Sequence, residues 1–131
     1  MNTTSFLLLR LAIGASMLGH GLVRLPKLQT FSKWMTGNFE KSMLPNGLVL
    51  PFSYVLPVAE FTIGLLIMLG LFTRPALIAG SIVMIMLITG TALIENWDAL
   101  PSQLIHVAIF AALINASGYN TLAIDNILFK K

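Results

Sequence analysis

The chain has 131 residues, of which 56% are hydrophobic and only 10% are charged, and its mean hydropathy is +0.86. This composition excludes an ordinary soluble domain. The net charge of +3 forms no basic stripe interleaved with aromatic residues, which excludes a nucleic-acid surface, and the lack of cysteine excludes disulfides and thiolate metal sites. We expect one all-α membrane domain over residues 1–131, without a metal site.

Residues 6–25 form the first predicted membrane span, because about 20 apolar residues suffice to cross the hydrocarbon core. An apolar N-terminal run can also be a signal peptide, but Arg10 interrupts this one, and we interpret it as a membrane helix. At helical spacing Arg10, Gly14 and Gly21 share one stripe, and His20 lies on a neighbouring one. Small residues on these stripes predict close packing against another helix.

The connection from Lys27 to Gly47 carries apolar residues at three- and four-residue intervals, among them Phe31 and Trp34, with Lys33 beside them. This pattern predicts an amphipathic helix that lies in the membrane interface between the first and second spans. The same helix could instead cover the membrane helices as a lid.

Residues 48–72 form the second predicted span, with Pro57 three residues before Glu60. Proline removes a backbone hydrogen bond and tends to kink a helix. A carboxylate within a span is costly unless it is neutralised, paired or hydrated, so Glu60 needs a partner. Our hypothesis is an ion pair with Arg10, which lies on the first span. In the alternative, Arg10 extends to the nearer interface and never meets Glu60.

Residues 76–94 and 102–117 form the third and fourth predicted spans, which completes a membrane four-helix bundle. Alternating spans place His20, Tyr54 and His106 in the same half of the membrane, with Glu60 near mid-depth. Two histidines on different helices are the minimum for haem ligation, but interfacial histidines usually only form hydrogen bonds, and we do not expect haem.

The ordered motifs of the chain resemble the DoxX family of small four-helix membrane proteins. The first span has the family's Arg, Gly, His-Gly and basic pattern, and the second has its Glu, Gly and Gly-Leu-Phe-Thr-Arg pattern. The C-terminal element is similar only with altered spacing. The matching positions are Arg10, Gly14, His20, Gly21, Arg24, Glu60, Gly64, Gly70, Leu71, Phe72, Thr73, Arg74, Gly118, Tyr119, Leu122 and Asp125.

The resemblance implies a protein of the cytoplasmic (inner) membrane, in a family related to subunits of a terminal quinol oxidase and of thiosulfate:quinone oxidoreductases. We expect an accessory subunit that supports a redox or stress-related membrane complex and binds quinone or lipid near His20, Glu60 and His106. Its expected partners are the bilayer and other membrane subunits or further copies of itself. Without haem, flavin or thiol motifs, the isolated chain is not expected to be an enzyme.

Two alternatives remain open at the level of the sequence. One is a quinone-dependent oxidoreductase subunit in which Glu60 or a histidine accepts protons from the quinol. The other is an oligomeric carrier for a small solute or protons. Basic residues are nearly balanced between the two sides, so the positive-inside rule does not orient the chain, and the family resemblance favours cytoplasmic termini.

Overall fold

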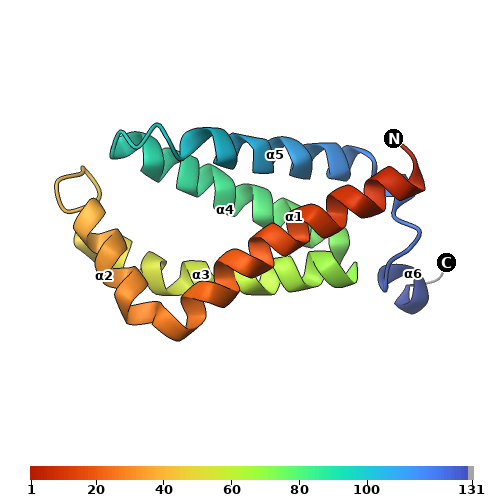
Figure 1. Cartoon of the computed structure of the whole chain (residues 1–131), viewed down its shortest axis with the longest axis horizontal. Coiled ribbons are helices and arrows are strands. Elements are labelled where there is room, and N and C mark those ends of the chain that lie inside the picture. The colour runs from red at the N-terminus through yellow and green to blue at the C-terminus, as the bar shows by residue number, and fades with distance from the viewer. Residues whose placement is uncertain (130–131) are drawn as a thin grey trace.

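The computed structural model describes residues 1–129, which form helices and no strand. Four helices pack in a closed ring, in which α1 (Thr3–Arg24) contacts α3 (Asn46–Leu69) and α5 (Leu100–Asn115), and α4 (Thr73–Leu93) also contacts both (Figure 1). The segment Thr3–Asn38, α3 and α4 are each long and apolar enough to cross a membrane, whereas α5 is an apolar helix of 16 residues. The prediction of an all-α protein with several membrane-span-length helices is confirmed.

Helix α2 (Leu28–Asn38) follows α1 through the short 3₁₀ helix η1 (Leu25–Lys27), which contains Pro26. It packs against the first half of α3 and buries Met35 and Ser32 there. The hydroxyl oxygens of Ser32 and Ser53 are hydrogen-bonded at 2.7 Å, which satisfies two buried polar groups at once. The predicted amphipathic helix is therefore present, and one of its faces packs on the protein itself.

Helices α1 and α3 cross at very short range because glycine occupies the contact points. A Cβ atom at Gly21 would lie 2.6 Å from the carbonyl oxygen of Pro57, and one at Gly64 would collide with the backbone of Leu18. At Gly14 the nearest atom, in the Met68 side chain, would be 3.0 Å away. The close packing predicted from the small residues of the first span is confirmed, and it fixes the register between α1 and α3.

At the opposite end, the C-terminal segment with η2 (Ser117–Tyr119) and α6 (Asp125–Leu128) folds back onto the turn between α3 and α4. Helix α3 ends at Leu69 and is capped by Gly70, whose φ of 69° lies in the left-handed region that glycine tolerates. The Asp125 carboxylate accepts hydrogen bonds from the backbone N–H groups of Phe72 (2.6 Å) and Thr73 (2.8 Å). Asp125 thus stabilises the start of α4. This helix begins at Thr73, three residues before the predicted start of the third span at residue 76.

Candidate functional site

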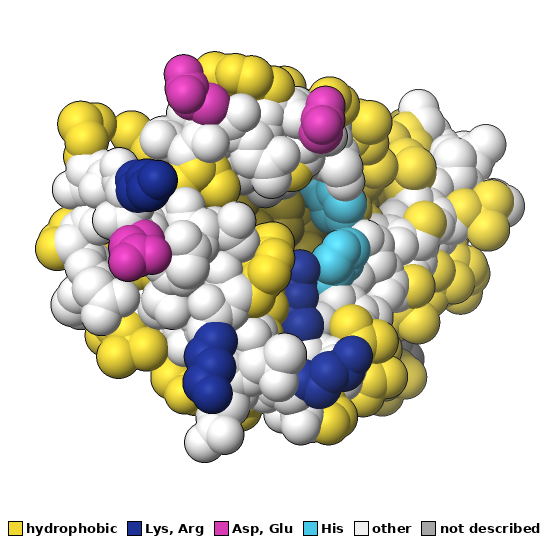
Figure 2. Space-filling model, turned by 60° about the vertical axis from the view of Figure 1, so that its left-hand side comes forward, with side chains coloured by type: hydrophobic (Ala, Val, Ile, Leu, Met, Phe, Trp, Pro, Cys, Tyr) yellow, Lys and Arg dark blue, Asp and Glu magenta, His cyan; other side chains and the backbone are white. Residues whose placement is uncertain are grey.

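A pocket of about 510 Å³ opens at the end of the ring where α1 and α4 end and α3 and α5 begin. Figure 2 shows this hollow, with both histidines and a basic side chain inside it. Its volume lies within the roughly 300–1,000 Å³ typical of small-molecule sites. We call it the end pocket. Its walls are mainly apolar and include Phe31, Trp34, Phe52, Leu56, Met84 and Leu87.

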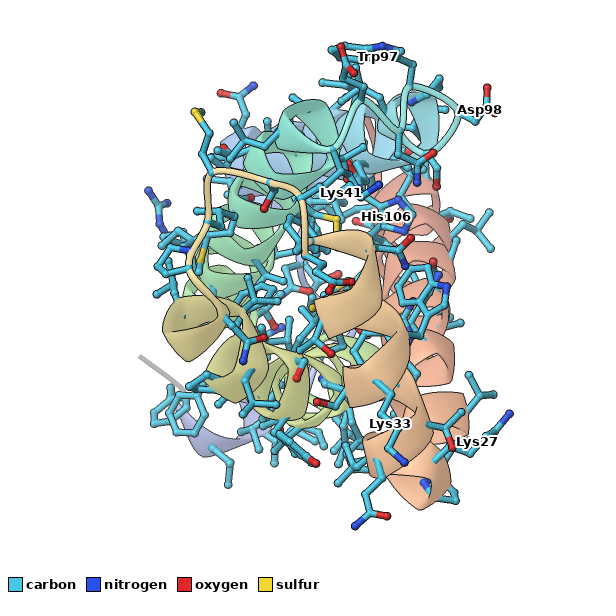
Figure 3. The ribbon with its side chains drawn as sticks, turned by 90° about the vertical axis from the view of Figure 1, so that its left-hand side faces the viewer. Lys27, Lys33, Lys41, Trp97, Asp98 and His106 are labelled. Atoms are coloured by element: carbon cyan, nitrogen blue, oxygen red, sulfur yellow. The ribbon has the colours of Figure 1, made fainter. Side chains whose placement is uncertain are left out.

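Several exposed charged side chains lie around the mouth of the end pocket and do not line it. In Figure 3, Lys27 and Lys33 point outward from η1 and α2, and Trp97 and Asp98 lie in the loop between α4 and α5, whereas His106 lies toward the interior. Lys27, Lys33, Trp97 and Asp98 are exposed, and none of them lines the pocket. Polar recognition inside the pocket therefore depends on a small number of other side chains.

The main polar feature of the end pocket is an ion pair between Arg24, at the end of α1, and Glu60, in the middle of α3. The Arg24 guanidinium donates to the Glu60 carboxylate at 2.8 Å. The Glu60 side chain is only 2% exposed, whereas that of Arg24 is 28% exposed. The guanidinium carbon of Arg24 also lies 4.6 Å from the centre of the Phe31 ring, a cation–π contact that connects α1 to α2.

The hypothesis that Arg10 pairs with Glu60 is therefore wrong. Gly21 packs against the segment of α3 from Pro57 to Phe61, and this register brings Arg24, one turn further along α1, to Glu60. Arg10 is buried at the opposite end of the ring. Its guanidinium donates to the Asn120 side chain at 2.6 Å and to the Leu122 carbonyl at 2.9 Å.

His20 and His106 face each other between α1 and α5, with ring centroids 6.2 Å apart in an edge-to-face arrangement. The Nδ1 atoms lie 2.6 Å and 2.7 Å from the carbonyl oxygens of Ser16 and Ser102, respectively. A carbonyl can only accept, so each Nδ1 carries a hydrogen, and in the neutral form of such a ring Nε2 is an acceptor. The Ser16 hydroxyl oxygen is hydrogen-bonded to Nε2 of His106 at 2.8 Å, whereas Nε2 of His20 has no partner among residues 1–129.

Two other residues singled out in the sequence lie outside the end pocket. Tyr54 is on α3 but is 40% exposed and does not line the pocket. Arg74 is exposed in the first turn of α4, at the end of the ring remote from the pocket. Of the predicted ligand-binding residues, the structure brings together His20, Glu60 and His106.

Sequence reasoning missed Gln103, which lines the end pocket one turn before His106 on α5. Its side-chain nitrogen donates to the Thr91 hydroxyl at 2.9 Å. Its amide oxygen is buried and has no hydrogen-bond partner in the described part of the chain. The available signal was a second polar residue, three positions before a histidine, in an otherwise apolar span.

Residues 1–129 contain no group of three or more acidic or histidine side chains arranged to hold a metal ion. Besides the ion pair, the polar side chains that line the end pocket are the two histidines, Thr89, Thr91, Asn96, Ser102 and Gln103. Groups of this kind can hydrogen-bond a neutral or anionic polar head, and apolar walls of this kind can accommodate a hydrocarbon body.

A family model described as DoxX matches residues 5–97 of the chain. The matched region contains α1 to α4, including Arg24, Glu60 and all of α2, whereas α5 and the C-terminal segment lie beyond it. No curated protein and no solved structure matches the chain. With its apolar membrane-span-length helices and a match over most of its length, the chain is a multi-pass membrane protein that belongs to the DoxX family.

Proposed function

We propose that this protein is an accessory subunit of a redox complex in the cytoplasmic membrane and that its end pocket binds a quinone-class ligand. In this proposal α1, α3, α4 and α5 all cross the membrane, α2 lies at the interface, and both termini are cytoplasmic. The observation that carries the proposal is the end pocket itself, whose apolar walls enclose an ion pair and a histidine.

The chemistry of these groups favours a ring with polar oxygens over a simple acyl chain. Arg24 has five N–H donors, and the structure assigns one of its nitrogens to Glu60, so a donor remains for a ring carbonyl. The Glu60 carboxylate and Nε2 of His20 can accept from a ring hydroxyl. A hydrocarbon tail would lie along Phe52, Leu56 and other apolar side chains of the wall. An acyl chain alone would offer nothing to the remaining N–H groups of Arg24 or to Nε2 of His20.

Tryptophan fluorescence tests this proposal because Trp34 lines the end pocket and Trp97 does not. The chain has no other tryptophan, so Trp97→Phe leaves a single reporter on the pocket wall and Trp34→Phe leaves one away from the pocket. We expect decylbenzoquinone to quench the Trp97→Phe protein saturably in lipid nanodiscs. The Trp34→Phe protein should show only the linear quenching of a ligand dissolved in the bilayer.

Decylbenzene serves as the matched competitor without oxygens. It should displace the quinone poorly, because it offers nothing to Arg24 or Glu60. Saturable quenching that decylbenzene abolishes as effectively as a second quinone would mean an unselective apolar pocket. Linear quenching in both tryptophan variants would mean that no quinone enters the pocket.

The arrangement of acceptors favours one further role, that of a subunit which takes protons from a bound quinol. The Glu60 carboxylate and the uncommitted Nε2 of His20 both belong to the pocket. Removing a proton needs an acceptor within hydrogen-bonding reach of the hydroxyl. This role is tested by quinol-dependent electron transfer in the complex that copurifies with the protein. His20→Gln should lower the rate at saturating quinol if the imidazole accepts the proton, and should leave it unchanged if the subunit is only accessory.

A further inference from the structure

The edges of the end pocket differ in chemical character from one side to the other. A side chain that lines a pocket and is also exposed marks a place where the pocket wall reaches the surface. We call the polar set on α1, α5 and the loop before α5 the mouth edge, and the set on α3 and α4 the α3–α4 edge. The mouth edge consists of His20, Asn96 and Ser102, the α3–α4 edge consists of Leu48, Met86 and Thr89, and Trp34 is the exposed lining residue of α2.

The α3–α4 edge is apolar and lies among side chains that face outward. Leu48 is 58% exposed and Met86 is 48% exposed. The hydroxyl of Thr89 donates to the Ile85 carbonyl of its own helix at 2.9 Å, so this donor is already satisfied. The nearby Leu50 and Ile85 are also apolar and exposed, and they do not line the pocket. Met86 lies about 10 Å before the end of α4, which is within the hydrocarbon of a membrane that α4 crosses.

The connection between α2 and α3, residues 39–45, crosses the end pocket between these two edges. Phe39 and Leu44, near the two ends of the connection, both line the pocket. The Phe39 ring lies against α4 at Gly90, where an added Cβ atom would be only 3.1 Å from Cζ of the ring. Gly90 follows Met86 by one turn and precedes Asn96, so the ring meets α4 between the two edges. A ligand that extends from the mouth edge to the α3–α4 edge therefore passes beneath this connection.

We propose that the end pocket holds its ligand in one orientation, with the polar head at Arg24 and Glu60 and the hydrocarbon tail leaving through the α3–α4 edge into the bilayer. This inference rests on the proposed function and deepens it, because it names the class of ligand as one with a long tail that is taken up from the bilayer.

The orientation follows from the surroundings that each edge offers to a tail. A tail that left through the mouth edge would place its methylenes in water beside the charged side chains around the mouth. Each methylene left in water lowers the affinity about fourfold. At the α3–α4 edge the tail passes from apolar walls directly into hydrocarbon, and no such penalty arises.

Photolabelling of the wild-type protein in lipid nanodiscs locates the tail. The probe is decylbenzoquinone with a diazirine at the end of its tail, and the competitor is an excess of decylbenzoquinone. Labels that the competitor suppresses come from the pocket, whereas labels from probe dissolved in the bilayer persist. We expect suppressed labels near Leu48 and Met86. Suppressed labels at Asn96 or Ser102, alone or together with those at the α3–α4 edge, would overturn the proposed orientation.

Tail length gives an independent test, because only a long tail reaches the α3–α4 edge. Leu48 precedes Glu60 by 12 residues, which is about 18 Å along α3. Leu48→Trp and Met86→Trp each narrow this edge at a position that is not buried. In titration calorimetry, each variant should weaken the binding of decylbenzoquinone by about tenfold, the effect of displacing one or two methylenes. Each should change the binding of methylbenzoquinone, which has the same ring without the long tail, by less than about twofold.

Two matched controls add the same ring at exposed positions that do not line the pocket. Leu50→Trp lies on α3 close to Leu48, and Ile85→Trp lies on α4 next to Met86. Neither control should change the affinity for either quinone. A loss of decylbenzoquinone binding in the controls as large as in the edge variants would contradict the inference.

The inference also fails if the two edge variants weaken both quinones equally or neither of them. These results leave the proposed function intact, because the wild-type protein still binds a quinone in the end pocket. If the wild-type protein shows no label that the competitor suppresses and binds neither quinone in calorimetry, both the proposed function and this inference are overturned.

Discussion

Replacing Arg24 by methionine should destabilise the protein more than replacing its partner Glu60 by glutamine. Arg24→Met leaves a carboxylate that is 2% exposed without its counter-ion, and breaking a buried ion pair from one side typically costs about 3–5 kcal/mol. Glu60→Gln leaves a guanidinium that is 28% exposed and rests on Phe31, and the new amide oxygen can still accept from it. We therefore expect Glu60→Gln to cost only about 1–2 kcal/mol.

The assay is unfolding in mixed micelles, with the free energy of unfolding obtained from a titration with denaturing detergent. The double variant Arg24→Met/Glu60→Gln should lose less free energy of unfolding than the two single variants lose when their losses are added. The reason is that Glu60→Gln removes the charge that Arg24→Met leaves unpaired. Arg10→Leu is the control, since Arg10 bonds to Asn120 and Leu122 at the other end of the ring. The free energy of unfolding lost in Arg10→Leu should simply add to that lost in Glu60→Gln. A larger cost for Glu60→Gln than for Arg24→Met, or equal coupling of Glu60 to both arginines, would refute this reasoning.

Two other features give predictions of their own. Asp125→Asn should weaken the docking of the C-terminal segment by about 1–2 kcal/mol, because a charged acceptor of two N–H groups is lost. The backbone amide of residue 125 should then exchange its hydrogen faster than in the wild type, whereas the control Asp98→Asn, in an exposed loop, should exchange like the wild type. Equal exchange rates in the wild type and both variants would contradict this prediction. Gly64→Val should push α1 away from α3 and lower the thermal midpoint, whereas Gly19→Ala, which meets open space, should leave it unchanged. Equal midpoints for the two glycine variants would show that the helices do not cross as closely as described.

Hydropathy alone located the long helices of this protein to within three residues at each end. The predicted spans 6–25 and 48–72 compare with Thr3–Arg24 and Asn46–Leu69, because each apolar run is bounded by proline, glycine or charged residues that mark the change of environment. The antiparallel order then followed from the short connections. This antiparallel order correctly placed His20 and His106 at the same end of the structure.

The partner of Glu60 could not be obtained from the sequence in the same way. Arg10 and Arg24 lie on one stripe of α1, so helical periodicity allows either of them to face α3. The choice depends on the register between the two helices, which Gly21 sets through its contact with the Pro57 carbonyl. No local pattern encodes that distance. Nor does any pattern indicate that Arg10 is satisfied by Asn120, which is 110 residues away in sequence.

The two hydrogen-bonded arginines of α1, Arg10 and Arg24, differ in when their partners become available during synthesis. Glu60 follows Arg24 by 36 residues, so that ion pair can form once α1 and α3 have both entered the membrane. Asn120 and Leu122 follow Arg10 by 110 and 112 residues, after α3, α4 and α5 have all been made. The pocket end of α1 can thus be completed early in biogenesis, whereas its other end keeps an arginine without these partners until most of the protein has been inserted.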